Sequence, residues 1–310
     1  LISVESTVYP GATEELILPK ILKSNPKLTV GSDFHLVFSP ERVDPGQKYW
    51  NLKNTPKIVG GITNNCTEIG STLYNALCDT VIKVSSARAA EMTKLLENTF
   101  RATNIGLVNE MAIISQKLNI DIWEIVEAAK TKPFGFMPFY PGPGLGGHCI
   151  PVDPRYLDWK LETLNSESKF IKLSEEINFS MPNFVVSRIK KIIKDINLKN
   201  PNILILGLAY KPNVSDIRES PVLDIIKLLN QENINFSYND PMVSSINIDG
   251  KLYNSQNIDD DLLKNTDLGL ITTDHSIYDW DHISNNLNYI FDTRNALRNI
   301  KKTKAEIFKL

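Results

Sequence analysis

The sequence predicts an α/β protein built from two Rossmann-like, doubly wound domains, the first of them incomplete, which are joined by a long central helix and a helical region. Short apolar runs of strand length alternate with segments of helical spacing near both ends of the chain. Between them, residues 89–117 keep apolar positions at helical period, which would give a helix of about 45 Å. A length of 310 residues favours about two domains. We expect the divisions 1–86, 87–182 and 183–310.

The first block alternates strands and helices, which is typical of a parallel sheet. Thr13 follows a Pro-Gly turn and is predicted to cap the helix that begins there. A second helix is expected at residues 67–78. The expected strands are 1–4, 34–38, 57–61 and 80–84.

The second block is predicted to be helical. The long helix is followed by a helix at residues 121–129 and, after a loop, by another at 170–180. The loop, residues 132–154, is rich in proline and glycine. Because loops of this length within compact domains are usually functional, we expect the site to involve it.

The third block has the pattern of a second doubly wound domain. A helix is expected at residues 183–196 and a buried strand at 203–207. Ser220 is predicted to cap the next helix, with Pro221 at its first position. Further strands are expected at 236–238, 268–272 and 289–292.

The composition excludes several classes of protein. Hydrophobic residues make up 42% and charged residues 23% of the chain, which excludes disorder, collagen and coiled coils. A net charge of -2 predicts no nucleic-acid partner, and no apolar run approaches the about 18 residues that span a membrane. Three cysteines without framework spacing predict a reducing, cytoplasmic setting. Without a zinc motif we expect no metal.

The glycine run in the long loop is not interpreted as a nucleotide fingerprint. Residues 142–147 fit G-x-G-x-x-G. Prolines at positions 138, 141 and 143 exclude the preceding strand that such a fingerprint needs. The glycines are interpreted instead as backbone kept small so that another group approaches closely.

Cys149 follows this run, beside His148 and four residues before Asp153. A single cysteine is ordinarily a small buried apolar residue. An accessible thiol with a favourable charge nearby is a nucleophile, and the setting of Cys149 favours that interpretation. Cys66 and Cys78 are interpreted as structural.

Four polar residues among the first hundred of the chain are candidates for the same chemistry. Lys94 and Asn98 are spaced i,i+4 and share one helix face, either as a solvated stripe or as an ammonium and an amide that stabilise an oxyanion. Glu41 and Thr7 follow predicted strands, where parallel sheets bind ligands.

Two cations in the third block indicate a phosphate site. Lys211 and Arg218 follow the strand at 203–207 and precede the helix that Ser220 caps. Such cations before a helix N-terminus are typical of phosphate binding, although an ordinary charged surface loop has the same composition.

Taken in order, six motifs resemble the UDP-glucose/GDP-mannose dehydrogenase family over essentially the whole chain. They are STVYPG (6–11), FSPERVDPG (38–46), KLLENTFR (94–101), GPGLGGHCIPVDP (142–154), GLAYKPNVSDIRESP (207–221) and YNDP (238–241).

The resemblance implies an NAD-dependent, four-electron oxidation of C6 of a UDP-sugar. Cys149 would carry a thiohemiacetal and then a thioester that water hydrolyses. Lys94 and Asn98 would hold the oxyanion and an ordered water. Asp153 and Glu41 would assist proton transfer, with Thr7 nearby.

The resemblance also implies binding residues and a homodimer or higher homo-oligomer. NAD would contact Thr7, Val152 and Arg218. The UDP-sugar would contact Glu41, Arg42, Lys94, Asn98, Pro138, Phe139, Tyr140, Pro141, Gly142, Gly146, Tyr210, Lys211 and Arg294.

The sequence of residues 133–154 is similar to that of the branch of the family that acts on UDP-N-acetylglucosamine. UDP-glucose and UDP-N-acetylmannosamine are the alternative substrates, and a non-catalytic nucleotide-sugar binding module is the alternative of another class. Pro45 stands where some UDP-glucose members carry a second glutamate, which favours the N-acetyl branch. The family begins with a strand and G-x-G-x-x-G that the chain lacks, so we expect a preceding segment that completes the NAD domain.

Overall fold

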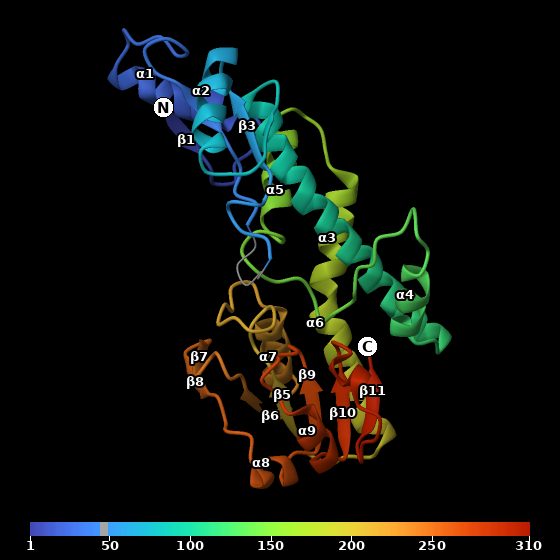
Figure 1. Ribbon diagram of the computed structural model, residues 1–310. Helices are drawn as coiled ribbons and strands as arrows, with labels where there is room; N and C mark the ends of the chain where they lie inside the picture. Colours follow the sequence, from blue (N-terminus) through green and yellow to red (C-terminus); the bar gives the residue numbers. More distant parts are fainter. Residues whose placement is uncertain (44–48) are drawn as a thin grey trace. The chain divides into compact units, whose positions relative to one another are not determined.

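The computed structural model describes residues 1–43 and 49–310 and divides into two compact units (Figure 1). Unit 1 comprises residues 1–101 and 152–171, and unit 2 comprises residues 102–151 and 172–310. The long helices α3 (Ala87–Leu118) and α6 (Lys169–Asp195) each contribute to both units. These units do not coincide with the three expected blocks, whose division stays a prediction.

Unit 1 contains a four-stranded sheet with the order β1-β2-β3-β4. Its strands are β1 (Ile2–Val4), β2 (Leu36–Phe38), β3 (Lys57–Gly61) and β4 (Val81–Lys83). Two pairs are parallel, but β2 pairs with β3 antiparallel, so the expected all-parallel sheet is wrong at that pair. Parallel pairing needs a crossover, usually a helix, and the described residues between β2 and β3 contain no helix.

Alternate residues of β2 and β3 pack on opposite faces of this sheet. Val37 and Val59 join a buried cluster with α2 (Asn64–Asn75), which includes Cys66. Phe38 and Ile58 join a cluster with the first turn of α3. Because successive strand residues face opposite sides of the sheet, each face is covered by a helix.

The segment after β1 begins with a π-helical turn, η1 (Thr13–Ile17), which runs into α1 (Leu18–Ser24). The backbone N–H and the hydroxyl of Thr13 donate to Oε1 of the buried Glu91 at 2.9 and 2.6 Å. The prediction that Thr13 caps this helix is wrong, because the carboxylate from α3 takes its hydroxyl.

Unit 2 contains a five-stranded, all-parallel sheet with the order β11-β10-β9-β5-β6, a two-stranded hairpin and helices on both faces (Figure 1). The sheet strands are β5 (Asn202–Leu206), β6 (Asn235–Asn239), β9 (Leu268–Ile271), β10 (Tyr289–Asp292) and β11 (Glu306–Lys309). Counted along the chain, this is the doubly wound order 2-1-3-4-5. The order reverses between β5 and β9, and ligands bind beyond the carboxyl ends of the strands at such a point.

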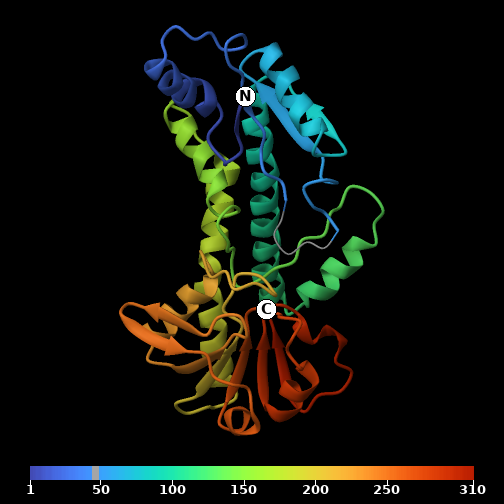
Figure 2. The ribbon, with the colours of Figure 1, turned by 60° about the vertical axis from the view of Figure 1, so that its left-hand side comes forward.

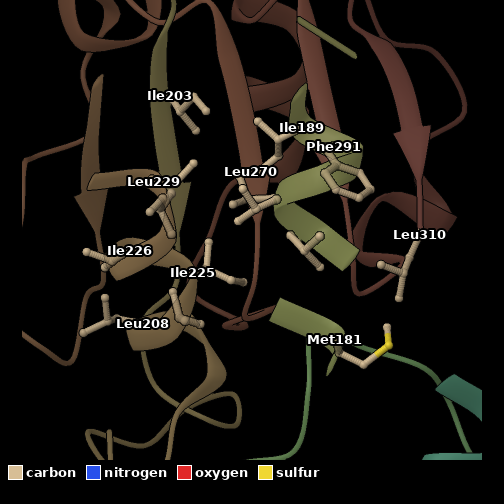
Figure 3. Packing of buried hydrophobic residues seen from close by; sticks show 14 of the residues in the cluster. Met181, Ile189, Ile203, Leu208, Ile225, Ile226, Leu229, Leu270, Phe291 and Leu310 are labelled. Carbon is tan, nitrogen blue, oxygen red and sulfur yellow. The ribbon is translucent and has the colours of Figure 1, made fainter. Parts of the chain in front are cut away.

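Two apolar clusters cover the two faces of this sheet. Ile203 and Ile205 of β5 pack with α6 and α7 (Pro221–Gln231), as Figure 3 shows for residues such as Ile189, Ile225 and Leu229. Leu204 and Leu206 pack instead with α8 (Asp260–Lys264) and α9 (Trp280–Asn286). The predicted cap of α7 is confirmed, since the Ser220 hydroxyl accepts from the backbone N–H of Val222.

Several elements differ from the expectation. Residues 170–180 and 183–196 were predicted as two helices, but they form the single helix α6 that continues through Pro182 (Figure 2). The hairpin β7 (Ser245–Ile248) and β8 (Lys251–Asn254) was not predicted, although its Asp249-Gly250 turn is a hairpin signal. The remaining helices are α4 (Ile122–Lys130), α5 (Asp153–Glu162) and the short η2 (Ala296–Asn299). In the described ranges, no helix is long and apolar enough to cross a membrane.

Gly207 should tolerate no side chain. It lies just after β5 with φ +93°, and an added Cβ would come within 2.4 Å of Thr273 Cβ and 2.7 Å of the Thr273 carbonyl oxygen. We expect Gly207→Ala to lower the free energy of unfolding by about 3 kcal/mol, because backbone strain and overpacking add. Gly250→Ala is the control: φ is +82° there, but no atom lies within 4 Å of the added Cβ. Urea denaturation should show that the control loses only about 1 kcal/mol of its free energy of unfolding. Equal losses in the two variants would contradict the argument.

Candidate functional site

A buried carboxylate brings three predicted site residues of unit 1 together. Asp153 is the first residue of α5 and is 2% exposed. Its Oδ2 accepts hydrogen bonds from Asn98 Nδ2 at 2.5 Å and from Thr7 Oγ1 at 3.2 Å. Asn98 is itself 8% exposed, so this face of α3 is buried there and is not a solvated stripe.

Lys94 and Glu41 also meet in unit 1. The Lys94 ammonium donates to the backbone carbonyl of Glu41 at 2.7 Å, and Glu41 Oε1 accepts from the backbone N–H groups of Arg42 and Val43. The Arg42 guanidinium forms an ion pair with Glu97 at 2.7 Å. Arg42, expected to contact the sugar nucleotide, therefore has a carboxylate partner within the protein.

Lys57, a residue that the sequence analysis did not single out, lies at the same edge of the sheet. Because β3 is antiparallel to β2, the start of β3 lies where β1 and β2 end. The Lys57 side chain is 4% exposed, and its Nζ lies 3.8 Å from Glu5 Oε1 and 3.9 Å from Glu41 Oε2. Burial and a hydrogen bond to Glu5 raise the pKa of the nearby Tyr74 to about 12. No local sequence signal indicates this cluster, since the strand direction creates it.

A pocket of about 480 Å³ opens beside the start of α5. Its lining is Tyr9, Val152, Arg155, Tyr156 and Trp159. Val152 was expected to contact NAD, and it lines this pocket next to Asp153. The pocket therefore presents aromatic surface beside the buried carboxylate.

In unit 2, two buried asparagines anchor the glycine-rich loop. The Gly142 N–H donates to Asn109 Oδ1 at 3.0 Å, and the Asn109 amide donates to Asn178 Oδ1 at 2.9 Å. Gly142 also touches Arg294, since an added Cβ would lie 2.4 Å from its Nη1. Arg294 Nε in turn donates to the Thr272 carbonyl, just beyond β9. Two predicted substrate contacts, Gly142 and Arg294, therefore meet beside the carboxyl edge of the sheet.

The end of the loop packs on the segment that follows β5. An added Cβ would approach the Tyr210 side chain to 2.7 Å at Gly146 and to 2.8 Å at Gly147. The Gly147 N–H donates to the Arg218 carbonyl at 3.0 Å. Cys149, two residues further on, is exposed, whereas Cys66 and Cys78 are buried. The glycines are thus needed for close packing, as the sequence indicated.

Arg218 is held by a carboxylate on its own loop. Its Nε and Nη2 donate to the two oxygens of Asp216, at 3.0 and 2.6 Å. These bonds lower the pKa of Asp216 and raise that of Arg218, and the guanidinium also interacts electrostatically with Tyr210 and Cys149. Arg218, expected to contact NAD, therefore places positive charge near the thiol.

The other residues of unit 2 that were expected to contact the substrate differ in burial and in their partners. Phe139 packs against the apolar core, and Pro141 is buried. Pro138 is half-buried. The Tyr140 hydroxyl donates to Glu127 on α4 at 2.7 Å, so this side chain is directed along α4. Lys211 lies beside Tyr210, with its Nζ 5.9 Å from the ring centroid.

Sequence reasoning missed a buried pair at the carboxyl edge of this sheet. Asp240 follows β6 and is 2% exposed, and His275 follows β9 and is 0% exposed. Asp240 Oδ2 accepts from the N–H groups of Leu208 and Ala209 at 2.6 and 2.9 Å, and it lies 3.1 Å from His275 Nε2. Burial opposes the charge of Asp240, but these hydrogen bonds outweigh it and hold its pKa below the usual value. The YNDP motif was the available signal.

In the described ranges, 1–43 and 49–310, no group of three or more His, Cys, Asp or Glu residues could hold a metal ion. Pro45, whose identity favoured the N-acetyl branch, lies outside these ranges. The two units thus supply different chemistry: unit 1 a buried carboxylate with an amide and a hydroxyl, and unit 2 an exposed thiol.

Three family models match the chain in order. The NAD binding domain of the UDP-glucose/GDP-mannose dehydrogenase family matches residues 1–78. The central domain of the same family matches residues 88–180, and its UDP binding domain matches residues 204–299.

Individual relatives agree with these matches. A UDP-N-acetyl-D-mannosamine dehydrogenase of Campylobacter jejuni is 41% identical over 239 residues, and a UDP-N-acetyl-D-glucosamine 6-dehydrogenase of Salmonella typhi is 39% identical over 248. These matches cover 75% and 79% of this chain but only 57% and 58% of the relatives. The solved UDP-N-acetyl-mannosamine dehydrogenase Cap5O of Staphylococcus aureus has a TM-score of 0.82 and 37% identity, over 99% of this chain and 71% of that one.

Asp240 should stabilise unit 2 in a pH-dependent way. Because the pKa of Asp240 is lowered on folding, its stabilisation is present above the unfolded-state pKa of about 4 and is lost as the pH falls further. We expect Asp240→Asn to cost about 2–3 kcal/mol at pH 7, with a smaller difference from wild type at pH 3. Asp224→Asn is the control, because Asp224 forms only an exposed pair with Lys227. Urea denaturation across this pH range measures both; a loss that does not depend on pH would contradict the argument.

Proposed function

The chain belongs to the UDP-glucose/GDP-mannose dehydrogenase family, and we propose that it takes part in the NAD-dependent oxidation of C6 of a UDP-N-acetylhexosamine to the uronic acid. The observation that carries the proposal is the exposed thiol of Cys149, on a loop that packs against Tyr210 of the matched UDP binding domain. A module that only bound nucleotide sugars would need neither this thiol nor the buried Asp153 with its two donors.

The proposed reaction proceeds in four balanced steps. The C6 alcohol loses a proton and a hydride to become an aldehyde. The Cys149 thiol adds to this carbon and forms a C–S bond, which gives a thiohemiacetal. Loss of a second hydride and the hydroxyl proton yields a thioester. Water then attacks, the C–S bond breaks, and the carboxylate leaves with the thiol restored.

NAD⁺, when bound, accepts each hydride, so two NADH form for each sugar. The residues of unit 1 suit such a ligand, because Thr7 and Glu41 follow the carboxyl ends of β1 and β2 and Val152 lines an aromatic pocket. Thr7 and Val152 would contact the cofactor. Arg218 is the third proposed cofactor contact.

The polar side chains of unit 1 would transfer protons and stabilise oxyanions. Asn98 and Lys94 are the donors, and Asp153 is the acceptor that receives a proton from the alcohol or from the attacking water. Asp153 is suited to this role because Asn98 and Thr7 fix the orientation of its carboxylate. Glu41 would assist, since two backbone N–H groups orient its side chain.

Unit 2 would bind the nucleotide sugar. Tyr210 and Lys211 follow β5 at the point where the strand order reverses, and Arg294 follows β10. Lys211 would pair with the diphosphate. Residues 138–142 and Gly146 would line the sugar site.

Two substrates remain in the proposal. The sequence of the loop favours UDP-N-acetylglucosamine as the substrate. The Campylobacter and Staphylococcus relatives, in contrast, are UDP-N-acetylmannosamine dehydrogenases. These sugars differ only at C2, so the proposed mechanism at C6 serves either. Parallel assays that include UDP-glucose would decide between them.

Cys149→Ser tests the mechanism in the full gene product. We expect wild type to form two NADH per UDP-N-acetylhexosamine, and the variant to lose at least about 10³-fold in uronic acid formation, because an alcohol does not form the thioester. NADH absorbance and mass analysis of the sugar product measure this.

Cys66→Ala is the matched control for that experiment, since Cys66 is buried in the apolar cluster of Val37 and Val59. It should retain two NADH per sugar for each folded molecule. Full four-electron turnover by Cys149→Ser would refute the thioester mechanism, and a faster reaction with UDP-glucose would refute the N-acetyl preference.

A homo-oligomer is the proposed assembly. Helix α3 exposes a row of large apolar side chains: Met92, Leu96, Phe100, Leu107, Met111, Ile114 and Leu118. Such a stripe on one helix is typical of an interface, and a second copy of the chain offers the same surface.

Leu107→Glu should weaken that assembly. Leu107 is 53% exposed on α3, and a buried charge at an interface is strongly unfavourable. We expect at least a tenfold rise in the dissociation constant, measured by light scattering over a dilution series. Leu252→Glu, at a 61% exposed position on β8, should leave the mass unchanged; an equal effect would contradict α3 as the interface.

A further inference from the structure

We propose that His275 is a positioning residue for the nucleotide-binding loop: its neutral imidazole, protonated on Nε2, links Asp240 to the backbone of Asn213 and so fixes the loop that presents Tyr210 and Lys211. This inference rests on the proposed function in one respect, namely that this loop binds the UDP part of the substrate.

The ring nitrogens of His275 have two different partners. Nε2 lies 3.1 Å from Asp240 Oδ2, and Nδ1 accepts from the backbone N–H of Asn213 at 3.0 Å. An ionised carboxylate only accepts and a backbone N–H only donates, so Nε2 must carry the proton and Nδ1 must lack it. The ring is completely buried, so water does not replace either hydrogen-bond partner. His275 is therefore held in one tautomer.

Asn213 ties the far part of the loop to the segment beyond β9. Its backbone donates to His275, while its side-chain Oδ1 accepts from the N–H and the hydroxyl of Ser276 at 2.9 Å each. Asn213 adopts φ +64°, a left-handed conformation that asparagine tolerates better than most residues. These three hydrogen bonds therefore stabilise a backbone conformation that few residue types adopt.

The base of the loop is anchored by the partner of His275. Asp240 Oδ2 accepts from Leu208 and Ala209, and the Tyr210 N–H donates to the Asp216 carbonyl at 3.1 Å. Tyr210 and Lys211 therefore lie between two anchored residues. The N–H of Ala209 is bonded to Asp240, and the N–H of Asn213 is bonded to His275. Tyr210 also supports Gly146 and Gly147, two to three residues before Cys149.

Holding this loop in advance would favour ligand binding. A loop that must be ordered when the nucleotide arrives loses affinity by the cost of ordering it. Loss of the buried hydrogen bond that holds the Asn213 backbone should weaken UDP binding by about 3- to 10-fold. Loss of the bond to Asp240 should matter less, because Asp240 keeps its backbone donors. The proposal therefore assigns to His275 an effect on nucleotide affinity without contact with the nucleotide.

Two variants separate the two bonds of the ring. In His275→Asn the amide oxygen takes the place of Nδ1 and keeps an acceptor for Asn213. In His275→Gln the amide nitrogen takes the place of Nε2 and keeps a donor for Asp240, but the Asn213 N–H loses its acceptor. His282→Gln is the matched control, because His282 lies 3.5 Å from Asp260 in an exposed pair.

The experiment measures the tautomer, the loop and the affinity in the full gene product. Long-range ¹H–¹⁵N spectra of the protein labelled at its histidines should show Nε2–H and an unprotonated Nδ1 for His275. Amide exchange in residues 208–216 should rise about tenfold in His275→Gln, stay near wild type in His275→Asn, and not change in β9 or β10. Calorimetry with UDP should show a 3- to 10-fold weaker Kd for His275→Gln and less than a twofold change for His275→Asn and His282→Gln.

An Nδ1–H tautomer, or unchanged exchange in His275→Gln, would overturn the proposal. Equal weakening by the Asn and Gln variants would also overturn it, because a general packing role would not separate them. If the tautomer and exchange results hold but wild type does not bind UDP, the proposed function fails and the role of His275 in the loop stands. If a variant unfolds, the tautomer spectrum of wild type still decides the assignment.

Discussion

One buried carboxylate, Asp240, determines the arrangement at the carboxyl edge of the second sheet. Its oxygens accept from backbone groups beyond β5 and β6 and contact the imidazole of His275 beyond β9. A charge this buried is stable only because several donors converge on it. The loop after β5 is therefore held by an ionised side chain, and not by apolar packing alone. The glycine-rich loop depends on it in turn, because Gly146 and Gly147 pack on Tyr210.

Two buried carboxylates, Asp240 and Asp153, differ in the donors described around them, and the difference suits different roles. Asp240 accepts mainly from backbone N–H groups, whose positions change only if the fold changes. Asp153 accepts from the side chains of Asn98 and Thr7, which rotate without disturbing the backbone. A carboxylate oriented by side chains can exchange a donor for a water or a substrate hydroxyl, as proton transfer requires. This contrast supports a structural role for Asp240 and a chemical role for Asp153.

Local pattern predicted most elements, and long-range contacts account for most of the errors. The strand at residues 57–61 was predicted from its apolar residues and lies there, but its antiparallel pairing depends on the path between β2 and β3. Thr13 has the local signature of a cap, yet Glu91, 78 residues away, takes its hydroxyl. The same holds for the site. Motif residues such as Asn98 and Asp153 were predicted, whereas Lys57 and His275 become visible only when the sheet brings them to its edge.

The glycine-rich loop leaves few of its own side chains for a ligand. Phe139 packs in the core, and the Tyr140 hydroxyl donates to Glu127. The N–H of Gly142 is already bonded to Asn109. A sugar nucleotide at this loop would therefore meet a rigid backbone surface, while its charge would be met by groups beyond the strand ends, such as Lys211 and Arg294. Fixed groups of this kind do not reorganise when the ligand arrives, so affinity depends on how firmly they are held beforehand. The anchors outside the binding surface are then as important for recognition as the contacts themselves.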